Sequence, residues 1–118
     1  MITGVGTDIV EVGRIRQVLK RRANFAARVF TAAEREYCLS GGNPAHRFAG
    51  RFAAKEAVAK SLGISLAWQD VEILADRSGK PVVGFLNGAT ALATGRKVLV
   101  SISHCRSYAV AHAVAVSD

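Results

Sequence analysis

Hydrophobic residues recur at helical spacing through the first half of the chain, after a short strand predicted at residues 1–7. An amphipathic helix is predicted over residues 12–29. The run Thr31-Ala32-Ala33-Glu34 matches a capping box and predicts a second helix that ends near Leu39. A third helix is predicted from about Ala45 to Leu62, because a glycine that can end it follows directly.

The second half of the chain alternates between hydrophobic and small or polar residues, as strands do. Its last segment alternates large side chains with alanines, which favours packing on both faces, against helices and against another subunit. The fold class is therefore α+β, one domain over residues 1–118, with helices on one face of a largely antiparallel sheet. The predicted elements are strands at Val71–Leu74 and Pro81–Phe85, a short helix at Ala89–Thr94, and strands at Lys97–Ser103 and Tyr108–Val116.

The net charge of +7 predicts that the protein binds an acidic partner. Nucleic acid, an anionic membrane, a polyphosphate ligand and an acidic protein all fit that charge. Cys38 and Cys105 lack CxxC spacing and are interpreted as free thiols in a reducing compartment. Neither a signal peptide nor a membrane-spanning run is recognisable, so a cytoplasmic protein without a membrane association is expected.

Asp8 follows the first predicted strand, beside Gly4 and Gly6, which permit close approach of another backbone. An acidic residue at the end of a strand often caps the helix that follows. The alternative is that its carboxylate binds a ligand.

The third predicted helix carries charges on its apolar stripe. Lys55 projects into the stripe, Glu56 lies at its edge, and Lys60 follows one turn later. In one interpretation Lys55 extends its amine to solvent and Glu56 pairs with Lys60. In the other, Glu56 and Asp8 bind magnesium while Lys55 and Lys60 face an anionic ligand, because magnesium takes one or two carboxylates and fills its shell with phosphate and water.

Ser103 and His104 end a predicted strand, where they could bind a phosphate or adenine or simply form a polar hairpin end. A Ser-His nucleophile is disfavoured, since there is no GxSxG elbow. Arg14, Arg21 and Arg28 recur at seven-residue spacing on the first helix. They form either a solvated face or a docking surface for an acidic helical partner.

Five segments in a fixed order resemble the holo-acyl-carrier-protein synthases, the short bacterial branch of the 4′-phosphopantetheinyl transferases. The resemblance spans nearly the whole chain, and the ordered combination is far more specific than any one segment. The segments are GVGTDIVE at 4–11, RVFTAAE at 28–34, RFAAKEA at 51–57 with Lys60 after it, GKP at 79–81, and VSISH at 100–104.

The resemblance implies a set of site residues. Asp8 and Glu56 would bind Mg²⁺ together with the coenzyme A diphosphate, which Lys60 would also hold. Ser103 and His104 would contact coenzyme A, and Arg14 with Arg21 would dock the acyl carrier protein. Short family members are homotrimers with active sites between subunits. Longer relatives carry a third acidic ligand where this chain has Val10.

The activity implied is transfer of the 4′-phosphopantetheine group from coenzyme A to a serine of apo acyl carrier protein, releasing 3′,5′-ADP, in fatty acid biosynthesis. Glu56 is the candidate base for the serine proton. Two alternatives stay open. A nucleic-acid-binding module fits the charge but lacks a recognisable signature and has 7% aromatic residues. A trimeric binding protein without transfer activity would not need Asp8, Glu56 and Lys60 together.

Overall fold

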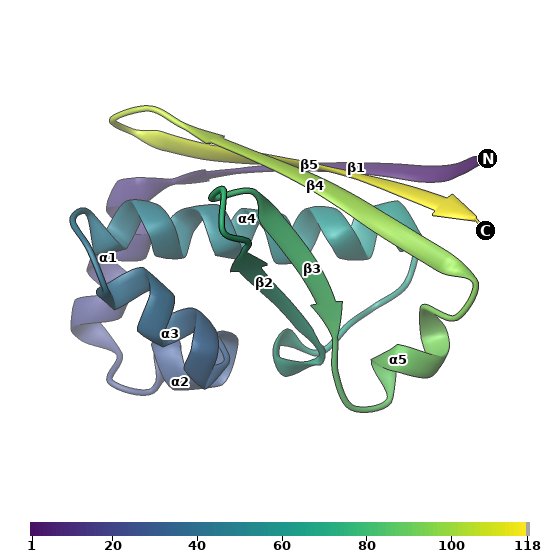
Figure 1. The fold of residues 1–118 in the computed structure, drawn as a ribbon. Helices are drawn as coiled ribbons and strands as arrows, with labels where there is room; N and C mark the ends of the chain where they lie inside the picture. Colours follow the sequence, from purple (N-terminus) through teal and green to yellow (C-terminus); the bar gives the residue numbers. More distant parts are fainter. Residues whose placement is uncertain (118) are drawn as a thin grey trace.

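The computed structural model describes residues 1–117, which form helices on one side of antiparallel strands (Figure 1). In chain order the elements are β1 (Ile2–Glu11), α1 (Val12–Arg21), α2 (Phe25–Val29), α3 (Ala32–Leu39), α4 (Pro44–Leu62), the 3-10 turn η1 (Trp68–Asp70), β2 (Val71–Ala75), β3 (Pro81–Phe85), α5 (Ala89–Leu92), β4 (Arg96–His104) and β5 (Tyr108–Ser117). The α+β class is confirmed, although the strands divide between two sheets.

The larger sheet has the antiparallel order β1-β5-β4, and α4 lies along one of its faces (Figure 1). The alanines of β5 point to α4 and are buried, whereas Tyr108 and His112 on the opposite face are exposed. The alternation in the sequence therefore identified the two faces correctly. We call the face turned away from α4 the open face; its large apolar residues include Val5, Ile9, Leu99, Tyr108, Val110, Val114 and Val116.

The smaller sheet is the β2–β3 hairpin, whose strands pair from Val71 opposite Phe85 to Ala75 opposite Pro81. It packs against the C-terminal half of α4, with Val71 and Ile73 fully buried. Within residues 1–117, no helix is both long enough and apolar enough to cross a bilayer.

Gly4 and Gly6 bring β1 into direct contact with α4. A Cβ atom added at Gly4 would lie 2.0 Å from the carbonyl oxygen of Ser61, and one added at Gly6 would lie 2.0 Å from that of Ala57. Side chains larger than hydrogen therefore cannot fit between strand and helix here. Because side chains alternate along a strand, Asp8 lies on this same face, directed toward α4.

The predicted helix over residues 12–29 is broken, which corrects the expectation from periodicity. The backbone of Arg22 is extended, and α2 begins only at Phe25. The break allows the Phe25 ring to lie edge-on to Phe30 at 6.1 Å and to stack on Phe52 at 6.4 Å. Tertiary packing of one aromatic side chain thus overrides a continuous helical pattern, and Arg28 does not share a helix with Arg14 and Arg21.

Helix α3 begins as the capping box predicted. Thr31 Oγ1 accepts from the backbone N–H of Glu34, and Glu34 Oε1 accepts from the N–H of Thr31 at 2.9 Å. Helix α4 ends at Gly63, which is left-handed with φ 68°. Both helix boundaries are therefore set by local sequence signals.

Both cysteines are free, as expected. Burial raises the pKa of the Cys38 thiol to about 11, which keeps it protonated. Cys105 is exposed, and backbone N–H groups, that of Ser107 first, lower the pKa of its thiol.

Candidate functional site

Asp8 and Glu56 line the same cleft, which has a volume of about 420 Å³. We call it the acidic cleft; its other walls include Val10, Arg14, Phe25 and Phe52. Two carboxylates that are far apart in the sequence therefore converge on one space because β1 lies directly on α4. Val10 contributes only an apolar wall to this cleft.

Asp8 lies inside β1, opposite Ala111 of β5, because the strand continues past the predicted end at residue 7. Its side chain is 20% exposed, and its Oδ1 atom lies 3.4 Å from Nζ of Lys60. The residue that precedes α1 is Glu11, and the side chain of Glu11 makes no capping bond. Asp8 is thus held toward α4 and does not cap the helix.

Glu56 does not pair with Lys60, which corrects the i,i+4 interpretation. Lys60 turns to β1 instead, where Nζ also donates to the carbonyl of Thr7 at 2.9 Å. Its side chain remains 54% exposed, so the ammonium can reach a ligand. Glu56 lines both the acidic cleft and a neighbouring cleft of about 430 Å³. We call the second one the loop cleft; Lys60, Gly63, Leu66 and Trp68 line it.

Lys55 is 2% exposed, which corrects the expectation that it extends its amine to solvent. Its Nζ atom forms an ion pair of 2.7 Å with Glu34 and donates to the carbonyls of Val29 and Trp68 at 2.8 and 2.7 Å. An ammonium has three N–H donors, and all three are used. Burial lowers the pKa of Lys55, and its hydrogen bond and ion pair with Glu34 oppose that shift. Lys55 is therefore a buried cation whose donors are all used within the protein, although its side chain also lines the loop cleft.

Aromatic rings separate the acidic cleft from a third one. Phe52 stacks on Trp68 with centroids 5.0 Å apart and on Phe25 at 6.4 Å. Behind these rings lies a cleft of about 670 Å³, rimmed by Arg22 and Arg28, which we call the aromatic cleft. Trp68 lines both the loop cleft and the aromatic cleft, so it forms the wall between them.

A match to a protein family identifies the kind of protein to which this site belongs. The model of the 4′-phosphopantetheinyl transferase superfamily matches residues 4–113, which include Asp8, Glu56 and Lys60. A holo-[acyl-carrier-protein] synthase of Protochlamydia amoebophila is 49% identical over 97% of this chain and 98% of its own length. The chain belongs to the holo-acyl-carrier-protein synthases.

Other members of the holo-acyl-carrier-protein synthases agree in sequence and in fold. The relative from Moorella thermoacetica is 46% identical over 96% of this chain and 93% of its own. The crystal structure from Neisseria meningitidis superposes with a TM-score of 0.90 at 34% identity, over 99% of this chain and 100% of that one. The Bacillus anthracis enzyme, solved in complex with CoA (3′,5′-ADP), gives 0.85 at 36% identity over 100% and 99%.

Ser103 and His104 lie apart from the acidic cleft. Ser103 pairs with Val110 and shares the open face, opposite to Asp8. His104 lies 5.4 Å, ring centre to ring centre, from His46 in the first turn of α4. Glu56 follows ten residues later, which is about 15 Å along the helix. One chain of this synthase therefore does not bring its Ser-His segment to the cleft that holds the two carboxylates.

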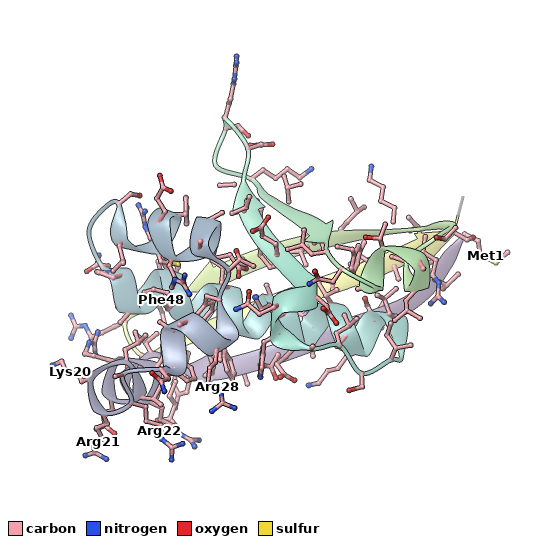
Figure 2. The ribbon with its side chains drawn as sticks, turned by 90° about the horizontal axis from the view of Figure 1, so that it is seen from below. Met1, Lys20, Arg21, Arg22, Arg28 and Phe48 are labelled. Carbon is pink, nitrogen blue, oxygen red and sulfur yellow. The ribbon has the colours of Figure 1, made fainter. Side chains whose placement is uncertain are left out.

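The cationic side chains are concentrated at the end of the molecule formed by α1 and α2. Figure 2 shows Arg21, Arg22 and Arg28 projecting outward from this end, with Lys20 beside them. Arg14 lines the acidic cleft and, together with Arg21, a smaller hollow of about 220 Å³ on α1. The predicted docking residues Arg14 and Arg21 thus begin at the rim of the acidic cleft and continue along α1.

Sequence reasoning missed Glu34 and Trp68 as residues that shape the site. The capping box revealed Glu34 as a helix signal but gave no sign that its carboxylate is completely buried. Trp68 is the single tryptophan of the chain, in a segment without periodicity. The available signal for Trp68 was a single tryptophan shortly after the helix that carries Lys55 and Glu56.

Proposed function

We propose that the protein is a holo-acyl-carrier-protein synthase that transfers 4′-phosphopantetheine from coenzyme A to a serine of apo acyl carrier protein in fatty acid biosynthesis. One observation carries the proposal: Asp8 and Glu56 line one cleft, with Lys60 beside Asp8. The relatives are named for this activity, and one was solved with coenzyme A. We further propose that the chain is one cytoplasmic domain.

Magnesium fits the side chains of the acidic cleft. Residues 1–117 contain no group of three clustered ligand side chains, but Asp8 and Glu56 provide a pair of carboxylates on one cleft. That number suits a magnesium ion whose remaining ligands are water and phosphate oxygens. When bound, the ion would neutralise charge on the diphosphate and orient it for in-line attack.

The remaining chemistry belongs to this chain's own residues. The serine oxygen forms a bond to the β-phosphorus while the bond between that phosphorus and the bridging oxygen breaks, and 3′,5′-ADP leaves with the electron pair. Glu56, which lines both the acidic and the loop cleft, would accept the serine proton directly or through water. Lys60 would offset the charge on the leaving group, since its half-exposed ammonium borders the loop cleft.

The decisive experiment is intact-mass analysis of apo acyl carrier protein incubated with the enzyme and coenzyme A. We expect the carrier to gain the mass of one phosphopantetheine group with magnesium present and none after chelation. Adding back magnesium should restore the gain. If the mass of the carrier stays unchanged under every condition, the proposed transferase activity is contradicted. If the carrier gains the full mass in the presence of chelator, only the proposed requirement for magnesium is contradicted.

We propose that the enzyme is a homotrimer in which the open face lies between subunits. Val5 is 70% and Ile9 63% exposed, and Leu99 and Tyr108 are nearly half exposed on the same face. Large apolar side chains gathered on one sheet face typically mark an interface. Such an assembly would also let Ser103 and His104 of one copy approach the acidic cleft of the next, which one chain alone does not achieve.

The double substitution Val5→Asp and Leu99→Asp is expected to prevent assembly, because it introduces charge into an apolar interface. Light scattering after gel filtration should give about 37.5 kDa for the wild type, three times 12.5 kDa, and about 12.5 kDa for the variant. Leu39→Asp with Leu92→Asp is the matched control, since both leucines are exposed elsewhere. A wild-type mass of 12.5 kDa would refute the trimer.

A further inference from the structure

Glu34 receives hydrogen bonds from three different parts of the fold. Its Oε1 atom accepts from Lys55 Nζ at 2.7 Å and from the N–H of Thr31 at 2.9 Å. Its Oε2 atom accepts from the N–H of Ile73 at 2.8 Å. Glu34 is completely buried, so the start of α3, strand β2 and the middle of α4 meet at one carboxylate.

Lys55 extends this junction toward the clefts. It precedes Glu56 on α4, and its Nζ atom holds the carbonyl of Val29 at the end of α2 and the carbonyl of Trp68 in η1. Both of these residues line the aromatic cleft, and Trp68 also lines the loop cleft. The turn of α4 that presents Glu56 is therefore fixed directly to the opposite wall of the site.

A buried ion pair is a costly way to fill a core. Apolar side chains of similar volume often stabilise such a position equally well or better, because they avoid the desolvation of two charges. An apolar residue at position 55, however, could not hold two carbonyl groups at fixed places. Gln69 Nε2 separately ties η1 to the carbonyls of Ala27, Arg28 and Phe30 around α2. What the Lys55–Glu34 pair adds is the direct polar link from α4, next to Glu56, to the carbonyls of Val29 and Trp68.

We propose that Lys55 and Glu34 are positioning residues for the transfer reaction, which act through Trp68 by fixing the wall that faces Glu56 across the loop cleft. Neither residue touches the reacting atoms. The kinetic part of the proposal rests on the function proposed above, whereas the structural part concerns the position of Trp68 alone. Coenzyme A is the substrate whose binding depends on this wall, because Lys60 and Glu56 border the same cleft.

The variant that tests the proposal is Lys55→Met combined with Glu34→Gln. Lys55→Met alone would leave a buried carboxylate without its cation and could prevent folding. The double variant is uncharged at both positions. The single oxygen of the glutamine can retain the capping bond from Thr31 while the bond from Ile73 is lost. The double variant also removes the two donors to Val29 and Trp68. Circular dichroism during thermal unfolding is expected to show a folded protein.

Trp68 provides the first readout, because it is the single tryptophan and its fluorescence needs no enzymatic activity. We expect the double variant to show red-shifted emission and stronger quenching by acrylamide than the wild type. The second readout is kinetic. A small displacement of a site wall can reduce kcat/KM about 100-fold. We expect most of the loss as a higher KM for coenzyme A, with the KM for carrier protein changed less than twofold.

Val98→Ala is the matched control, because it weakens the core beneath β4 and lines none of the three clefts. A purely structural loss reduces the amount of folded enzyme, so it lowers kcat and leaves both KM values unchanged. If the double variant behaves like Val98→Ala, or if its Trp68 fluorescence equals that of the wild type, the positioning role is refuted. Absence of transfer in the wild type would refute the proposed function and leave the fluorescence test intact.

Discussion

Asp8→Asn and Glu56→Gln are each expected to lower kcat at least about 100-fold while the fold is retained. Each amide has the shape of the acid it replaces but lacks the negative charge that attracts a magnesium ion. Glu56→Gln also removes the proposed acceptor of the serine proton. Steady-state transfer assays at saturating coenzyme A and carrier protein would measure the loss.

The stability of these variants should change little. Asp8 makes one ion pair, at 3.4 Å with a lysine that is 54% exposed, and such a pair contributes at most about 1 kcal/mol. Lys60 retains its bond to the carbonyl of Thr7. Isothermal titration with magnesium in the presence of 3′,5′-ADP separates a metal defect from other losses. Glu36→Gln, an exposed acid on α3 outside the three clefts, is the control; wild-type rates in Asp8→Asn or Glu56→Gln would overturn the assignment.

Elements defined by local signals could be predicted from the sequence. Helix α3 follows from its capping box, and the end of α4 follows from Gly63, because both depend on neighbours in the chain. The alternation of large residues and alanines along β5 also revealed its two faces, because alternation too depends only on neighbouring residues. The break after Arg21 could not be predicted, since no proline or glycine marks it and the cause is the packing of Phe25 on distant rings.

The site was predictable in its residue types but not in its connections. The pattern showed that Lys55 faces the apolar side of α4, yet its partner Glu34 lies 21 residues earlier (55 − 34) and appeared only as a helix cap. Likewise, Gly4 and Gly6 indicated a close approach without saying that α4 was the neighbour. Ion pairs between separate elements depend on how those elements pack, and periodicity within one element contains no information about that.

Double charge reversal, Arg14→Glu with Arg21→Glu, is expected to raise the KM for acyl carrier protein about 30-fold. Both side chains are exposed on α1, and they are seven residues apart, about 10 Å along the helix, so their effects should add. Each reversal replaces an attraction with a repulsion toward an acidic partner, at a cost of about 1 kcal/mol per site. Two sites give about 2 kcal/mol, which corresponds to about 30-fold.

The KM for coenzyme A should stay within about twofold of the wild type, because Arg21 lines none of the three clefts and Arg14 only the rim of the acidic one. The wild-type KM for carrier protein should rise with added salt, because salt screens the attraction between the arginines and an acidic carrier. The variant lacks this attraction, so its KM should not rise with salt. Arg77→Glu with Lys80→Glu, in the β2–β3 turn, changes the net charge equally and serves as control. Equal effects of both pairs would mean that total charge, and not a docking surface on α1, recruits the carrier.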